Sequence, residues 1–345
     1  MRPKTFVVVL AVTAVSVIAA GYAVVSEDLS TAAAAGASTP VFPDLLAHAN
    51  DVQSITIVDA KGKATLQRQN GKWVYAEKGG YPAATDRIIK LAAGLANLRY
   101  LEPKTDQPDR YGRLEVEDVD KKDAKSRLVT LAGADGKPLA SLLIGKANYT
   151  LGDNAPGGVY VRVPGEARAW LAEGSIDLPD DKIDWVPRSV IDVKDIAVQR
   201  IVFQPAGTPE LSVAKADRAA KDFTLAPLPA GKMADPDAVA RLGGAFGGLM
   251  LDDVRTDDAT VKSVAAGAAE LTTFDGVTVH ADLLSIDSAI WLRLKAAGAE
   301  GTDAGKQAKT INDAVAGWLF KIPQFKSSLL QPKVDDYLKK GDGTS

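Results

Sequence analysis

The sequence has no cysteine and only two histidines, His48 and His280, among its 345 residues. Without cysteine there are no disulfide frameworks, thiolate metal sites or cysteine nucleophiles. Two histidines leave little for zinc chemistry or for acid–base catalysis. A strong excess of one charge is also missing: 41 basic residues against 44 acidic ones give a net charge of −3. A nucleic-acid partner normally requires a basic excess. We therefore expect no nucleic-acid binding.

The composition is otherwise that of a folded globular protein. Hydrophobic residues make up 46% of the chain and charged residues 25%, which excludes collagen-like and wholly disordered chains. At about 150 residues per domain, a chain of this length predicts two domains.

The N-terminal region has one long apolar run, residues 6–25. At about 1.5 Å per residue, a helix of this length spans roughly 30 Å, the hydrocarbon thickness of a bilayer. Arg2 and Lys4 precede the run, and Glu27 and Asp28 follow it. The positive-inside rule then predicts a single-pass inner-membrane protein with a cytoplasmic N-terminus. The bulk of the chain would lie in the periplasm of a Gram-negative bacterium.

A cleaved signal peptide is the alternative, but its apolar core should be only about 7–15 residues long. A possible cleavage site, residues 19–21, lies inside the run. The sequence thus predicts four parts: a membrane anchor or signal segment (1–26), a tether (27–50), a first module (51–190) and a second module with a C-terminal helical tail (191–345).

The first module alternates strand and turn signals. Val52–Val58 alternates apolar and polar residues, as in a half-buried strand. Thr85 or Asp86 is placed to cap a helix that reaches Leu98. Further strands are predicted at 64–68, 73–76, 127–131, 139–144, 159–163 and 169–171.

The same order recurs in the second module. Val198–Phe203 matches the first strand, and Asp235 is placed to cap a helix that includes Gly243–Gly248. Strands are predicted at 210–214, 223–226, 270–274, 277–283 and 290–295, and a helical stretch at 303–320. Tight turns between neighbouring strands favour antiparallel pairing. The predicted fold is α+β: two tandem related modules of antiparallel β-meander plus helix, behind an N-terminal transmembrane helix.

Several motifs suggest a site, and each has a plainer explanation. Gly243–Gly248 fits neither a phosphate-binding loop nor a dinucleotide loop, so close packing explains it better. Two aspartate groups lack the glycine and glutamate of a calcium loop, so solvated surface carboxylates are expected; they are Asp118, Asp120 and Asp123, and Asp252, Asp253, Asp257 and Asp258. The turn-rich residues 152–158 are a loop that either contacts a partner or simply joins two strands.

The sequence predicts no catalytic role for the histidines or the tryptophans. His48 has no acidic neighbour at catalytic spacing, and His280 is expected to be a polar residue on one face of a strand. The tryptophans either form a sugar-binding platform or anchor the core, and their even spread favours the core; they are Trp73, Trp170, Trp185, Trp291 and Trp318. We therefore predict no catalytic, cofactor-binding or metal-binding residue, and no cofactor.

Segments along most of 52–340 resemble the DUF4340 family, a domain of unknown function. The resemblance lies in the order of short motifs: Gly71–Trp73, Gly79–Pro82, Arg110–Leu114, Leu142–Gly145, Val159–Arg162, Asp184–Arg188 and Gly317–Pro323. The resemblance implies a membrane-anchored bacterial protein similar to accessory components of ABC-type transporters. It implies no catalytic residue.

We therefore expect a non-catalytic, periplasm-facing accessory or scaffold protein. Its partners would be the membrane, through residues 6–25, and proteins of a transport assembly. An envelope polysaccharide- or lipid-binding module is the alternative, with a groove between the modules as its site. An exported hydrolase that uses a carboxylate pair is the third candidate.

Overall fold

The computed structural model describes residues 39–149 and 157–339, which form two units that meet between Val186 and Pro187. The sequence placed this boundary after residue 190. The predicted membrane span, residues 6–25, lies outside the described residues. No helix in the part of the chain that the structure describes is long and apolar enough to cross a membrane.

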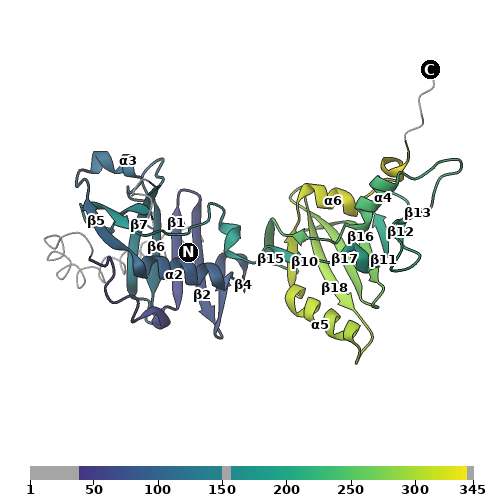
Figure 1. The fold of residues 1–345 in the computed structure, drawn as a ribbon, viewed down its shortest axis with the longest axis horizontal. Helices are drawn as coiled ribbons and strands as arrows, with labels where there is room; N and C mark the ends of the chain where they lie inside the picture. The colour runs from purple at the N-terminus through teal and green to yellow at the C-terminus, as the bar shows by residue number, and fades with distance from the viewer. Residues whose placement is uncertain (1–38, 150–156, 340–345) are drawn as a thin grey trace, which may run out of the picture. The chain divides into compact units, whose positions relative to one another are not determined.

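The first unit contains one antiparallel sheet with the order β4-β3-β2-β1-β6-β7-β8-β9-β5 (Figure 1). Two meanders, β1 to β4 and β6 to β9, lie side by side through the pairing of β1 with β6. The chain between them passes through α2 and returns to the far edge as β5. The strands are β1 (Ser54–Asp59), β2 (Gly62–Gln69), β3 (Lys72–Tyr75), β4 (Tyr81–Pro82), β5 (Arg99–Pro103), β6 (Arg127–Ala132), β7 (Pro138–Asn148), β8 (Gly158–Arg162) and β9 (Ala169–Glu173).

Helix α2 (Thr85–Asn97) crosses one face of this sheet (Figure 1). Ile88, Leu91 and Leu95 are buried, at the helical spacing that the sequence predicts. The predicted cap is wrong: the helix begins after Ala84 without a side-chain cap, and the Ala84 N–H donates to Trp185 O at 2.7 Å. A short helix, α3 (Tyr111–Leu114), follows β5.

Part of the predicted tether (27–50) belongs to the first unit. Val41 and Leu45 are buried in the first unit. Pro40 pairs with Arg99 at the start of β5. Residues 39–50 are therefore part of the first unit and not of a tether.

The second unit repeats the strand order. Its main sheet runs β13-β12-β11-β16-β17-β18-β19-β15, all antiparallel, and matches β3-β2-β1-β6-β7-β8-β9-β5 strand for strand. The strands are β11 (Val198–Pro205), β12 (Leu211–Ala214), β13 (Thr224–Ala226), β15 (Asp253–Thr256), β16 (Val264–Thr273), β17 (Thr278–Ile286), β18 (Ala289–Ala297) and β19 (Trp318–Lys321). A separate pair joins β10 (Ser189–Ile191) to β14 (Leu249–Met250). The mixed α+β class and the antiparallel pairing are confirmed.

The described part of this unit has three α-helices: α4 (Pro236–Gly243), α5 (Asp303–Val315) and α6 (Gln324–Leu330). Asp235 caps α4 as predicted, because its carboxylate accepts from the Asp237 and Ala238 N–H groups. Two helix predictions were too long. Helix α4 ends at Gly243, so Phe246 lies in a turn and Leu249 in β14, and residues 318–321 form a strand after Gly317, whose φ is +80°.

Candidate functional site

Most motifs singled out in the sequence have structural roles. Helix α4 lies so close to Phe223 that a Cβ on Gly243 would come within 2.2 Å of its ring, so close packing explains this part of the glycine cluster. Lys326 is buried and donates to Gly247 O at 2.5 Å and Gly244 O at 3.1 Å. Burial lowers the pKa of the Lys326 ammonium group. The glycine cluster thus ends helix α4, and its backbone carbonyl groups accept hydrogen bonds from the buried Lys326 ammonium group.

The aspartates do not gather into a metal site. Asp118 Oδ1 accepts a hydrogen bond from Arg162 Nη2 at 2.5 Å. Asp252 Oδ1 lies 3.5 Å from Arg188 Nη2. Asp258 accepts from Thr256 and from both the N–H and the hydroxyl of Thr260, and these hydrogen bonds lower the pKa of its carboxyl group. Within residues 39–149 and 157–339, no three histidine or acidic side chains are placed to hold a metal ion. The loop residues 152–156 lie outside the described residues.

His48 does have an acidic neighbour, contrary to the sequence analysis. Its Nδ1 lies 2.8 Å from Asp51 Oδ2. Both side chains are more than half exposed, so the pair is a surface contact in which water competes. Of the tryptophans, Trp73, Trp185 and Trp291 are buried, which agrees with core anchoring. Trp170 and Trp318 are partly exposed, and the Trp170 ring packs against Tyr100 with centroids 4.7 Å apart.

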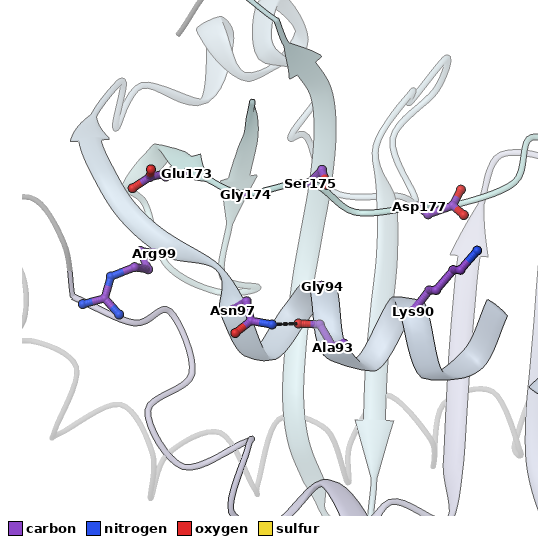
Figure 2. A pocket seen from close by; sticks show the side chains of 9 residues that line it. All are labelled: Lys90, Ala93, Gly94, Asn97, Arg99, Glu173, Gly174, Ser175 and Asp177. Atoms are coloured by element: carbon purple, nitrogen blue, oxygen red, sulfur yellow. Dashed lines mark hydrogen bonds between the residues drawn. The ribbon is translucent and has the colours of Figure 1, made fainter. Parts of the chain in front are cut away.

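The first unit has a hollow of about 570 Å³ between α2 and the segment that follows β9. Figure 2 shows Lys90, Ala93, Gly94 and Asn97 along the helix, and residues 173–177 running beside it. Asn97 Nδ2 donates to Ala93 O at 2.9 Å, within the helix itself (Figure 2).

Glycine allows the two walls of this hollow to approach each other. A Cβ on Gly94 would lie 2.9 Å from Ser175 O, and one on Gly174 would lie 3.0 Å from Leu98 Cδ2. The charges are balanced, with two cations, Lys90 and Arg99, and two carboxylates, Glu173 and Asp177. In Figure 2 the Arg99 side chain points away from the helix side chains. This hollow therefore presents no excess charge and no paired nucleophile and base.

The second unit has a smaller hollow of about 340 Å³. A network of charged side chains from neighbouring strands lies along it. Arg293 on β18 donates to Asp257 from Nε at 2.6 Å and from Nη2 at 2.8 Å. Its Nη1 lies 3.5 Å from Asp282 on β17. The two carboxylates raise the pKa of the Arg293 guanidinium group further above its ordinary value.

His280 extends this network along β17. Its Nε2 lies 3.1 Å from Asp282 Oδ1, and its Nδ1 lies 3.6 Å from Glu270 on β16. The sequence predicted that His280 is a polar residue on one face of a strand, and this is confirmed. It did not predict the network, because the partners come from four separate segments that only the sheet register brings together. With Trp318 and Lys295 also on its wall, the hollow offers hydrogen-bonding groups beside an aromatic ring.

Comparison with known proteins adds the family. No curated protein matches the chain. The model of the family described as a domain of unknown function, DUF4340, matches residues 73–267, which include most of the first unit and extend into β16 of the second. Because this match covers more than half of the 345 residues, the chain belongs to the DUF4340 family.

Proposed function

We propose that this protein is a non-catalytic accessory protein of an ABC-type transport assembly, anchored in the inner membrane by residues 6–25. The apolar run and its flanking charges support the anchor and its orientation. The two units would then lie in the periplasm and act as a scaffold for partner proteins.

The observation that carries the proposal is the way the chain enters the first unit. Thr39 O accepts from the Tyr100 N–H at 2.8 Å, and the Val41 N–H donates to Leu98 O at 2.9 Å. The chain thus joins the edge of the sheet directly after residues 27–38. Twelve residues reach at most about 40 Å when fully extended. A membrane segment that ends at residue 26 would therefore hold the β5 edge within that distance of the bilayer.

The edges of the two sheets favour docking through side chains. The edge strands have only two to five residues in the described structure: β4, β5, β13 and β15. Pro82 and Pro103 lie within two of them. Short strands and proline oppose the addition of a partner strand. A partner would accordingly meet loops and sheet faces.

The test is a crosslinked, detergent-solubilised pull-down of the full chain, with intact-mass analysis of its N-terminus. The matched control carries a cleavable signal peptide in place of residues 1–26. We expect an uncleaved chain that brings down the ATPase and permease subunits of a transporter, and a control that does not. A processed chain that is released from the membrane and recovered alone would overturn the proposal.

The second candidate function is binding of an envelope polysaccharide or lipid. Burial of three tryptophans weakens a broad aromatic platform, whereas Trp318 on the wall of the second unit's hollow favours a smaller site. An exported hydrolase has less support. Burial raises the pKa of the Glu166 carboxyl group, as a general acid requires, but Glu166 lines neither of the two hollows.

A further inference from the structure

The hollow of about 570 Å³ in the first unit is a trough between two walls. One wall is a face of helix α2 whose residues follow helical spacing: Lys90, Ala93, Gly94 and Asn97. The other wall is the segment 173–177, which continues beyond the end of β9 (Figure 2). A Cβ on Gly94 would lie 2.9 Å from Ser175 O, so the two walls approach each other at the middle of the trough. An end of the trough lies on either side of this contact.

One end of the trough is positively charged. The exposed Lys90 side chain extends from the helix toward the side of Asp177 (Figure 2). Arg87 Nη1 already lies 4.0 Å from Asp177 Oδ2. Among the described residues, no hydrogen bond or ion pair engages the Lys90 ammonium group. Two cations beside one carboxylate therefore leave a positive charge at this end.

The other end offers a carboxylate. Glu173 lies directly opposite Arg99 in the pairing of β9 with β5. The two form no ion pair, and Figure 2 shows the Arg99 side chain turned away from the helix side chains. The Glu173 carboxylate thus has no partner in the part of the chain that the structure describes. A cation from a ligand would supply one.

The two unpartnered charges are separated by about the length of two helical turns. Lys90 and Asn97 are seven residues apart, which is about 10 Å along a helix, and Glu173 lies at the Asn97 end (Figure 2). The side chains between the ends are uncharged. Asn97 uses one N–H for Ala93 O, which leaves its Oδ1 and its second N–H for other partners. The Ser175 hydroxyl adds a further donor and acceptor.

This pattern favours a ligand with opposite charges at its two ends. A ligand of uniform charge would match only one end of the trough. In a single amino acid the ammonium and carboxylate groups are too close together to reach both ends. An extended peptide advances about 3.3 Å per residue, so three residues span about 10 Å. The amide groups of such a peptide would also suit the uncharged middle, because amides both donate and accept hydrogen bonds.

We propose that the trough between α2 and residues 173–177 is a binding site for a short peptide of about three residues with both termini free. Its C-terminal carboxylate would bind Lys90, its N-terminal ammonium group would bind Glu173, and its amides would bind Asn97 and Ser175. This site lies within the first unit and does not depend on the proposed scaffold function.

The test is isothermal titration of the purified full chain in detergent with trialanine. Alanine carries both charges but is too short, and trialanine blocked by N-acetylation and C-amidation has the length without the charges. We expect each of these two compounds to bind at least tenfold more weakly than trialanine. Equal binding of alanine or of the doubly blocked peptide would overturn the proposal, and so would no binding of trialanine.

Variants locate the site. Lys90→Gln and Glu173→Gln should each weaken the binding of trialanine at least fivefold. Lys72→Gln is the matched control, because Lys72 is an exposed lysine on β3 that does not line the trough. It should leave binding unchanged. Equal effects of Lys72→Gln and Lys90→Gln would refute this location.

Singly blocked peptides test the orientation. Trialanine amide has no carboxylate, so Lys90→Gln should not weaken its binding further. N-acetyl-trialanine has no ammonium group, so Glu173→Gln should not weaken its binding further. The reverse pattern would refute the assigned orientation. If a variant fails to fold, the blocked peptides still test the charges on the unaltered chain, and loss of partners in the pull-down would leave these results intact.

Discussion

Asn312 binds both backbone groups of Ala296 with its carboxamide, at 2.7 Å and 2.8 Å. The side chain of a helix residue thus occupies the place of a neighbouring strand. Helix α5 packs on β18, and this contact fixes one end of the helix to the sheet. The arrangement satisfies the N–H and C=O groups of Ala296 with a side chain from the helix.

Replacing Asn312 with alanine should destabilise the second unit. The change leaves the Ala296 N–H and C=O without their partner, and an unsatisfied buried group costs about 1–3 kcal/mol. Alanine favours helices and offsets a few tenths of this cost. We expect the free energy of unfolding to fall by about 1–3 kcal/mol in chemical denaturation.

Asn97→Ala is the matched control for that experiment. Asn97 also lies in a helix, but its side chain donates only to Ala93 O of the same helix and is exposed. Its replacement should change the free energy of unfolding by no more than about 0.5 kcal/mol. Similar losses for the two variants would contradict a specific role for Asn312.

Arg162 should not tolerate replacement by lysine. Its buried guanidinium group donates to Val116 O at 2.9 Å, to Glu166 O at 3.0 Å and to Asp118, and it lies over the Tyr111 ring at 4.4 Å. Lysine has no planar fork to serve these acceptors together. We expect Arg162→Lys to cost about 2–4 kcal/mol in thermal or chemical unfolding.

The exposed Arg168 provides the comparison for Arg162. It donates to Lys104 O and to Asp106 at the surface, where water competes for the same groups. Arg168→Lys should change the free energy of unfolding by less than about 0.5 kcal/mol. An Arg162→Lys variant as stable as Arg168→Lys would show that the buried contacts contribute little.

The sequence predicts the long elements of this fold because their own periodicity is strong. The alternation of residues 277–283 identifies β17, and the spacing of Ile88, Leu91 and Leu95 identifies α2. Sequence-based prediction fails for strands that exist only through pairing with a partner far away in the chain. Strands β14 and β15 have two and four residues, and their pairing with β10 and β19 defines them.

The end of α5 shows why the strand that follows it, β19, was missed. Val315, Trp318 and Leu319 continue the helical spacing, so the apolar pattern runs on into what is a strand. Gly317, with φ at +80°, ends that pattern. The register of β19 depends on its pairing with β15 and β18, and no local pattern encodes it.

Gly145 on β7 should be intolerant of any side chain. A Cβ at this position would lie 2.2 Å from Leu114 O and 2.8 Å from Val116 Cγ1. A backbone oxygen in a short helix cannot move aside as a flexible side chain does. We expect Gly145→Ala to cost about 3 kcal/mol in chemical denaturation.

Gly112 in α3 is the matched glycine for that variant. No atom lies within 4 Å of a Cβ built there, and its φ is not positive. Gly112→Ala should raise the free energy of unfolding by about 0.4–1 kcal/mol, because it restricts the unfolded chain. If Gly145→Ala were also neutral or stabilising, the contact between β7 and α3 would be looser than the structure has it.

Glu166 should make stability depend on pH in the direction opposite to that of an ion-paired carboxylate. Burial raises the pKa of its carboxyl group in the folded protein above the value in the unfolded chain. Between these two values the folded state binds more protons, so this group lowers the free energy of unfolding as pH rises through that window. Glu166→Gln removes the charge and should stabilise the protein at pH 7, where the buried wild-type carboxyl group is ionised against the cost of burial. The gain should vanish below about pH 4, where the wild-type carboxyl group is itself protonated.

The measurement is chemical denaturation of both proteins at pH 7 and pH 4, with the exposed Glu300→Gln as the control. A gain of equal size at both pH values would mean that the amide, and not the loss of charge, stabilises the fold.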